Sequence, residues 1–257
     1  MAGDLANKAK QVAVPVMNVI RFKGLPVLKQ LQLEEKLFRG SSSNWCITND
    51  GTSPASIVMG ISGRADELLE IRDVVRDNIP VIRRFTGGGT VIVDDGTVFV
   101  TLICNKDDLP KVQPYPKSIM SWSGNLYNLV FGVDTGFQLR ENDYVFGDRK
   151  FGGNAQSITK NRWLHHTSFL WNYEDRNMAY LKVPSRAPNY RSKREHSEFL
   201  CPMKNFISKQ DFIGRLLNSL SMQFVMSPII LEDIESYFSD FVHSTRLISK
   251  QELLNQR

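Results

Sequence analysis

The sequence predicts an α+β domain in which helices cover a mixed, largely antiparallel sheet. Three observations support this prediction: apolar residues recur at helical spacing near the N-terminus, strand-like segments dominate the middle of the chain, and helical spacing returns after Pro202. The chain has 257 residues, of which 42% are apolar and 23% are charged, so it can bury a large core. No stretch of about 18 apolar residues is present, and no membrane-spanning segment is expected.

Helical spacing is clearest in three segments. From Leu25, leucines and a phenylalanine fall near one face until Gly40, a residue type that commonly ends helices. The same spacing covers residues 63–78, ahead of a proline, and residues 114–132. We therefore expect a helix over each of these segments.

Strand-like segments lie between and after these helices. Residues 57–59 form a short apolar run, and residues 90–93 and 97–103 flank Asp95-Gly96, a dipeptide that favours a tight hairpin turn. Further strands are expected over residues 137–144, 146–156 and 163–171. The sequence therefore predicts a hairpin at Asp95-Gly96 within a larger sheet.

The end of the chain again shows helical spacing. Two helices are expected after Pro202, one around Leu216 and one around Tyr237. Between the sheet and these helices, residues 184–194 carry several basic side chains between two prolines and have no periodicity, which indicates a loop. The last helices would form a small extension from about residue 205.

The composition excludes several kinds of site. The three cysteines are far apart and lack C-x-x-C spacing, so a disulfide framework or a zinc ribbon is not expected, and a reducing compartment fits best. The four histidines lack the H-E-x-x-H spacing of a metal site. The net charge of +5 suits phosphate ligands, nucleic acid or an acidic protein partner without choosing among them.

A glycine-rich segment is the first candidate for chemistry. Arg83 and Arg84 stand just before Gly87, Gly88 and Gly89. Glycines permit positive φ and let backbone N–H groups approach an anion closely, while the arginines supply charge. The segment is neither a P-loop nor a G-x-G-x-x-G motif. On these residues alone, a phosphate or carboxylate site and a flexible turn with solvated arginines fit equally well.

Two further segments carry polar groups among strand residues. Lys150 is followed closely by Gly-Gly-Asn, which fits an ammonium group held beside a ligand, but a hairpin turn at Gly147-Asp148 with an exposed lysine is the alternative. The string His165-His166-Thr167-Ser168 fits either a ligand contact or a partly buried polar pair.

In this order and spacing, the three segments resemble the lipoate-protein ligase A branch of the biotin and lipoate A/B protein ligase family. The most specific parts are R-R-x-x-G-G-G-x-V-x-x-D from Arg83, N-D…D-R-K-x-x-G-x-A from Asn142, and H-H-T-x-x-L from His165. The resemblance covers roughly residues 28–200. It implies a catalytic domain like those of class II aminoacyl-tRNA synthetases and biotin–lipoate ligases over residues 1–204, followed by a short helical extension over 205–257.

The resemblance also implies an activity and a set of site residues. The enzyme would activate lipoate or octanoate with ATP and join the acyl group to a lysine of an acceptor protein. Lys150 would contact the acyl carbonyl and the α-phosphate, and Mg²⁺ would lie near Asp143. The other binding residues implied are Arg84, Gly87, Gly88, Gly89, Thr90, Val91, Ile92, Asn142, Asp143, Gly153, Asn154, His166 and Thr167. The chain departs from the family pattern at Val93, where a histidine is usual, and at Thr167, where a glycine is common.

Partners and compartment follow from the same resemblance. The acceptors would be acidic lipoyl domains of 2-oxoacid dehydrogenase E2 subunits and the H-protein of the glycine cleavage system, with no membrane or nucleic-acid partner. About fifty residues follow Asn205, so the accessory C-terminal domain of longer bacterial ligases is not expected, and a partner subunit could be needed for activation. These acceptors favour the mitochondrial matrix, with the cytoplasm as the alternative.

Three other functions stay open on the sequence. A lipoyl or octanoyl transferase that acts without ATP on ready-made lipoyl-AMP or a lipoylated donor protein would share every site residue. A cysteine-dependent acyl transferase would need an accessible thiolate, for which Cys201 is the weak candidate. A nucleic-acid module would need aromatic residues among the basic ones near residues 186–194, where Tyr190 is the one present.

Overall fold

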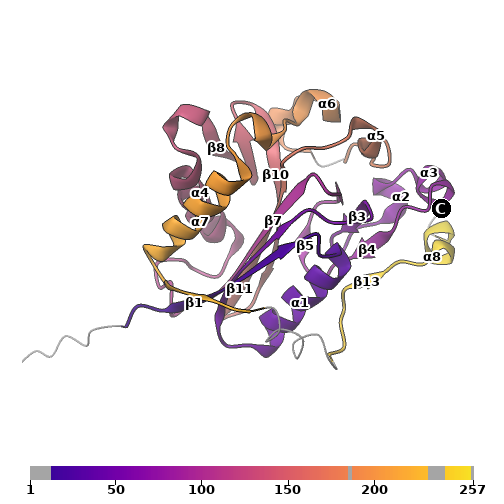
Figure 1. The fold of residues 1–257 in the computed structure, drawn as a ribbon. Coiled ribbons are helices and arrows are strands. Elements are labelled where there is room, and N and C mark those ends of the chain that lie inside the picture. The colour runs from indigo at the N-terminus through magenta and orange to yellow at the C-terminus, as the bar shows by residue number, and fades with distance from the viewer. Residues whose placement is uncertain (1–12, 185–186, 231–240, 256–257) are drawn as a thin grey trace, which may run out of the picture.

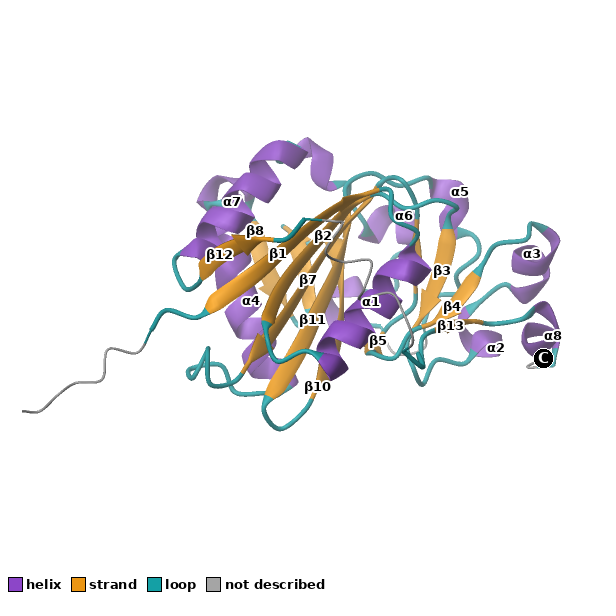
Figure 2. Ribbon diagram, turned by 60° about the horizontal axis from the view of Figure 1, so that its bottom comes forward, coloured by secondary structure: helices purple, strands orange, loops and turns teal. Residues whose placement is uncertain are grey.

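The structure is a computed structural model that describes residues 13–184, 187–230 and 241–255. In these residues the strands form two sheets, and helices pack on both faces of the larger one (Figures 1 and 2). The larger sheet has the order β12-β1-β2-β7-β11-β10-β9-β8, with β5 also paired to β10, and the smaller has the order β13-β4-β3-β6. Three strand pairs are parallel and the rest are antiparallel. The predicted α+β fold with a mixed, largely antiparallel sheet is therefore confirmed.

The bounds of the elements are as follows. The larger sheet contains β1 (Val16–Lys23), β2 (Asn44–Asp50), β5 (Gly87–Gly88), β7 (Thr97–Asn105), β8 (Phe137–Arg140), β9 (Asp143–Phe146), β10 (Arg149–Ile158), β11 (Arg162–Leu170) and β12 (Val225–Pro228). The smaller sheet contains β3 (Ser56–Met59), β4 (Val81–Arg83), β6 (Val91–Val93) and β13 (Arg246–Leu247). The α-helices are α1 (Val27–Gly40), α2 (Ala65–Leu68), α3 (Ile71–Arg76), α4 (Pro116–Phe131), α5 (Asp175–Met178), α6 (His196–Phe199), α7 (Lys209–Ser221) and α8 (Lys250–Leu254).

Two of the predicted helices, α1 and α4, form with local signals that explain their ends. The first amide of α1, that of Val27, donates to the Thr52 hydroxyl 2.8 Å away. Helix α4 begins with a proline, which lacks the N–H that a helix leaves unpaired at this position, and ends before Gly132 at φ +73°. No helix among the described residues is long and apolar enough to cross a membrane.

The helix expected over residues 63–78 is instead two short helices, α2 and α3. The chain between them is extended, because Leu69 forms an isolated bridge with Leu181 and the Glu70 amide donates to the Tyr180 carbonyl. These contacts come from a segment more than 100 residues later in the sequence. Tertiary pairing therefore overrides the local helical pattern.

The prediction of a hairpin at Asp95-Gly96 is wrong. Strand β6 pairs with β3 in the smaller sheet, whereas β7 pairs with β2 and β11 in the larger one. The turn between them is held by Asp94, whose carboxylate accepts from the Gly96 amide at 2.9 Å and from the Asn177 side chain at 2.9 Å. The Asp-Gly dipeptide therefore turns the chain from one sheet to the other.

The residues after 204 join both sheets. Helix α7 packs beside α4, and its Phe212, Leu216 and Leu220 belong to the largest apolar cluster. Strand β12 extends the larger sheet and β13 extends the smaller one, two strands that the helical prediction missed. The second helix expected around Tyr237 falls largely on residues 231–240, outside the described residues. The described part of this segment therefore shares the core of the residues before it.

Candidate functional site

A cavity of about 650 Å³ lies where the glycine-rich segment, β10, β11 and the chain around residues 178–200 meet. This volume is in the range of small-molecule sites. Twelve of the fourteen residues predicted for the site line it: Arg84, Gly88, Gly89, Thr90, Val91, Ile92, Asn142, Asp143, Lys150, Gly153, Asn154 and His166. The fold therefore brings three distant sequence segments to one place.

The two predicted residues that do not line the cavity support it. Gly87 pairs with Gln156 where β5 meets β10. The Thr167 hydroxyl donates to the side-chain oxygen of Asn154 at 2.8 Å, and the Asn154 amide donates to the Asn142 carbonyl at 3.0 Å. Both residues hold the cavity wall from behind.

The cavity has an apolar end. Val27, Leu31 and Phe99, from α1 and β7, line it and belong to one buried cluster with Val58 and Val93. None of these five side chains carries a charge. The arrangement suits a ligand with an apolar chain.

The polar end contains Lys150, which is paired with Asp143. The Lys150 Nζ lies 2.7 Å from Asp143 Oδ1, and the Tyr190 hydroxyl donates to Asp143 Oδ2 at 2.9 Å. Burial and the charge of Asp143 raise the pKa of Tyr190, so the phenol stays protonated and keeps donating. The β9–β10 turn at Gly147-Asp148 does form, but the Lys150 side chain lines the cavity, is 24% exposed and pairs with Asp143.

Arg84 lines the cavity and is held against the backbone of the glycine-rich segment. Its side chain is buried, and its guanidinium donates to the carbonyl groups of Val58, Gly87 and Gly89 at 3.3, 3.3 and 2.7 Å. Burial lowers the pKa of Arg84 to about 10, and the charge of Glu34 opposes this change. These hydrogen bonds hold the backbone of the glycine-rich segment in place.

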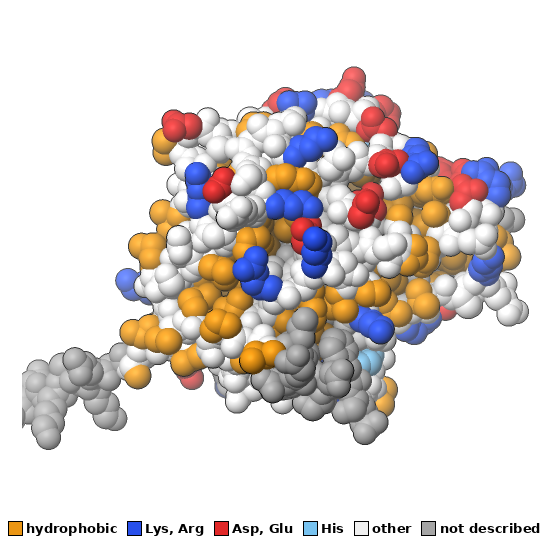
Figure 3. All heavy atoms as spheres, in the orientation of Figure 1, with side chains coloured by type: hydrophobic (Ala, Val, Ile, Leu, Met, Phe, Trp, Pro, Cys, Tyr) orange, Lys and Arg blue, Asp and Glu red, His pale blue; other side chains and the backbone are white. Residues whose placement is uncertain are grey.

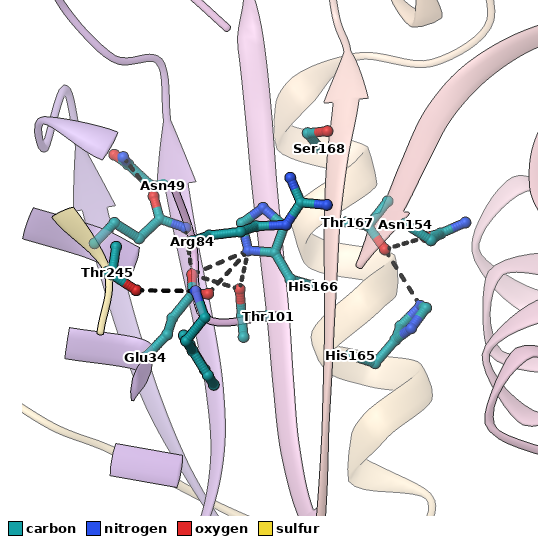
Figure 4. Close-up of polar contacts among 12 residues, drawn as sticks. Glu34, Asn49, Arg84, Thr101, Asn154, His165, His166, Thr167, Ser168 and Thr245 are labelled. Carbon is teal, nitrogen blue, oxygen red and sulfur yellow. Dashed lines mark hydrogen bonds and ion pairs between the residues drawn. The ribbon is translucent and has the colours of Figure 1, made fainter. Parts of the chain in front are cut away.

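His166 is held by a buried carboxylate from α1 (Figure 4). Its Nδ1 lies 3.0 Å from Glu34 Oε2, and Glu34 Oε1 also accepts from the Thr101 hydroxyl and the Gln30 amide, both at 2.8 Å. Glu34 is fully buried, so these donors are its compensation for leaving water. With Nδ1 committed to Glu34, Nε2 is the ring nitrogen left for a ligand.

His165, next to it on β11, points the other way (Figure 4). The Gln156 amide nitrogen lies 3.1 Å from its Nδ1, and the Tyr144 hydroxyl lies 3.0 Å from its Nε2. Because the amide is a donor, Nδ1 accepts and Nε2 carries the proton. Burial lowers the pKa of His165 to about 3, so this ring is neutral at physiological pH. It is a structural histidine.

Three polar residues at this site, Glu34, Arg191 and His196, were not singled out from the sequence. Glu34 carried a usable signal, because it lies with Gln30 on the apolar, buried face of α1. Arg191 lines the cavity from the basic loop of residues 184–194, where periodicity gives no information, and His196 lines it from the start of α6. Figure 3 shows Lys and Arg side chains gathered over the middle of the face that it presents, with acidic ones between them.

The described residues include no group of three or more His, Cys, Asp or Glu side chains that could hold a metal ion. Both oxygens of Asp143, the carboxylate expected near Mg²⁺, are bonded to Lys150 and Tyr190. The described side chains alone therefore do not fit a protein-made Mg²⁺ site.

Comparison with known proteins places these features in a family context. A family model described as the lipoyl protein ligase A/B catalytic domain matches residues 26–221. The inactive lipoate–protein ligase 2 of Plasmodium falciparum is 29% identical, over 78% of this chain and 67% of that protein. Lipoate-protein ligase A of Blochmanniella floridana is 28% identical over 60% of this chain and 45% of its own length, and with several such relatives the match spans about half of their length or less.

Solved structures show the same fold. A crystal structure of lipoate-protein ligase A bound with ATP has a TM-score of 0.67 and 18% identity, covering 88% of this chain and 93% of that one. A bi-partite lipoate protein ligase with its E2 lipoyl domain from Thermoplasma acidophilum also has a TM-score of 0.67, with 20% identity over 88% of this chain and 91% of that one.

Proposed function

The chain belongs to the lipoyl protein ligase A/B family, and on that premise we propose that it activates lipoate or octanoate with ATP and transfers the acyl group to a lysine of an acceptor protein. The observation that carries this proposal is the two-ended cavity. Val27, Leu31 and Phe99 provide an apolar wall for an acyl chain, and Lys150 stands beside the glycine segment at the polar end. A fatty acid that becomes an acyl adenylate needs both ends.

The chemistry requires two steps. A free carboxylate does not acylate an amine in water, because oxide is a poor leaving group. In the first step a carboxylate oxygen attacks the α-phosphorus of ATP and pyrophosphate leaves. In the second step the amine of the acceptor lysine attacks the acyl carbon, loses a proton, and AMP leaves. Lys150, fixed by Asp143, would neutralise the charge that develops on the phosphate and acyl oxygens.

The relatives support a lipoyl domain as the acceptor. The Thermoplasma acidophilum structure comes from a lipoylation system described as a bi-partite lipoate protein ligase and its E2 lipoyl domain. The net charge of +5 would favour association with acidic domains, and added salt should weaken that attraction. Because that ligase is bi-partite, a partner subunit in the activation step is part of the proposal for this chain.

Transfer without ATP is the second candidate. The Plasmodium falciparum relative is named inactive, and a chain that only transfers a ready-made acyl group would need the same cavity. The two functions differ in one reagent. An enzyme of the first kind needs ATP with the free acid, and one of the second kind uses lipoyl-AMP alone.

The test is acylation of a purified lipoyl domain, detected as an increase in the intact mass of that domain. Lipoate and octanoate are each supplied with ATP, without ATP, and as the preformed adenylate, with and without candidate partner subunits. Product from free acid and ATP is the expected result. Product from the preformed adenylate, with none from free acid and ATP, supports transfer without activation. If no condition gives product, the proposal fails.

A matched pair of variants tests the lysine. Lys150→Ala should slow adenylate formation by about 100-fold or more, as expected for loss of a group that stabilises developing charge. Lys160→Ala removes an exposed lysine from the turn that follows β10 and should have no effect. Adenylation that survives in Lys150→Ala would refute the role of Lys150.

A further inference from the structure

Arg191 lines the cavity with a hydrogen-bond donor that has no partner. The residue is 4% exposed, and its Nη2 atom is buried without a hydrogen bond. The rest of the side chain is fixed: Nε donates to the Arg194 carbonyl at 2.9 Å, and the guanidinium carbon lies 4.8 Å from the centre of the Phe199 ring. An unpaired buried donor on a charged group is costly, so this one indicates a missing acceptor.

The neighbours of Arg191 place it at the polar end of the cavity. Tyr190, the preceding residue, donates to the same Asp143 carboxylate that pairs with Lys150. His196 also lines the cavity, and burial together with the charges of Arg191 and Lys150 lowers its pKa, which favours a neutral ring. Lys150 and Arg191 therefore both line this end, where Asp143 pairs with Lys150 and the Glu141 carboxylate accepts from the Tyr190 amide at 3.3 Å.

We propose that Arg191 binds the phosphate of the acyl adenylate. The inference rests on the proposed function and identifies the group that meets the phosphate. Both Nη atoms of Arg84, the arginine that the sequence favoured, donate to backbone carbonyl groups, so its one unpaired nitrogen is the inner Nε, whereas Arg191 has a terminal nitrogen left over. Because Lys150 and Asp143 are neutral as a pair, Arg191 supplies a positive charge that matches the single negative charge of an acyl-adenylate phosphate.

Two ligands that differ only at the phosphate test this role. Octanoyl-AMP carries the phosphate, and 5′-O-octanoyl adenosine lacks it. Arg191→Gln should weaken octanoyl-AMP binding by about 10- to 100-fold, the range expected for loss of a charge-assisted hydrogen bond, while binding of the neutral ligand changes by less than about twofold. Binding is measured by calorimetry. The neutral ligand also reports that the variant is folded.

Two more variants complete the design. Arg191→Lys keeps the charge and should restore part of the lost affinity. Lys193→Gln makes the same charge change at an exposed position two residues away and should leave both affinities unchanged. Equal weakening of both ligands in Arg191→Gln would show a structural role and overturn the inference, as would no weakening of either. If the wild-type chain does not bind octanoyl-AMP, the proposed function fails first, and this inference fails with it.

Discussion

A methyl group added at Gly88 should do far more damage than one added at Gly89. Gly88 has φ +120°, a backbone conformation that residues with a Cβ rarely adopt. A Cβ there would lie 2.8 Å from the Asn154 carbonyl oxygen and 2.8 Å from Nη2 of Arg84. At Gly89 a Cβ would meet nothing within 4 Å. The two neighbours therefore form a matched pair of substitutions.

The expected loss follows from two contributions. A non-glycine residue in such a backbone region costs about 1 to 3 kcal/mol. Displacing the Arg84 guanidinium weakens its hydrogen bonds to the Gly87 and Gly89 carbonyls, and a hydrogen bond to a charged group contributes about 1.5 to 3 kcal/mol. Gly88→Ala should thus lower the free energy of unfolding by about 3 to 5 kcal/mol, and Gly89→Ala should change it by less than about 0.5 kcal/mol.

Urea denaturation followed by circular dichroism and tryptophan fluorescence measures both values. The two probes must give coincident transitions for the free energies to be comparable. If Gly88→Ala and Gly89→Ala differ by less than about 1 kcal/mol, the neighbour contacts do not set the conformation of this segment. The glycine string would then be a flexible turn, the alternative that the sequence alone left open.

Three further predictions concern other parts of the chain. Burial raises the pKa of Glu35, but hydrogen bonds from the Ser244 and Thr245 amides outweigh this effect and lower the pKa. The ionised carboxylate therefore stabilises the fold above about pH 4.5, and this stabilisation is lost as the pH falls further. In urea denaturation, the stability advantage of the wild type over Glu35→Gln should be about 1 to 3 kcal/mol at neutral pH and should shrink at lower pH, and a difference that stays constant with pH would contradict the prediction. All three cysteines are buried, so native protein should keep its thiols and its activity in iodoacetamide, as intact mass and the acylation assay can show; inactivation would favour the cysteine-dependent transferase. Tyr190→Phe removes the hydroxyl that donates to Asp143, and it should lower kcat for adenylation while costing only about 0.5 to 1.5 kcal/mol in stability; an unchanged kcat would exclude a positioning role.

Local sequence patterns were sufficient to predict helices that bury one continuous face. Helices α1 and α4 each bury one face along their whole length, so apolar spacing and end signals located them. The pattern over residues 63–78 looked similar, but Leu69 pairs with Leu181 and breaks the helix. The Asp-Gly turn failed for the same reason, because its two strands find their partners in different sheets. No local pattern contains that information.

At the site, the sequence indicated which segments converge but not how each charge is used. Arg84 and Arg191 are both arginines in basic stretches, and either could have been the anion contact. The difference is set by what surrounds each guanidinium. Both Nη atoms of Arg84 donate to the Val58, Gly87 and Gly89 carbonyls and only its Nε is unpaired, whereas at Arg191 a terminal nitrogen, Nη2, is buried without an acceptor. Sequence spacing cannot report where backbone carbonyl groups point.

The four residues of the string His165-His166-Thr167-Ser168 alternate between two roles, lining the cavity and supporting it from the other face of the strand. Successive side chains of a strand point to opposite faces, so His166 and Ser168 line the cavity while His165 and Thr167 do not. His165 is fixed between Tyr144 and Gln156, and Thr167 holds the cavity-lining Asn154 through a hydrogen bond. The family resemblance counted Thr167 among the binding residues, as one that braces the pocket. Its geometry fits that role, because its partner Asn154 is the residue that lines the cavity.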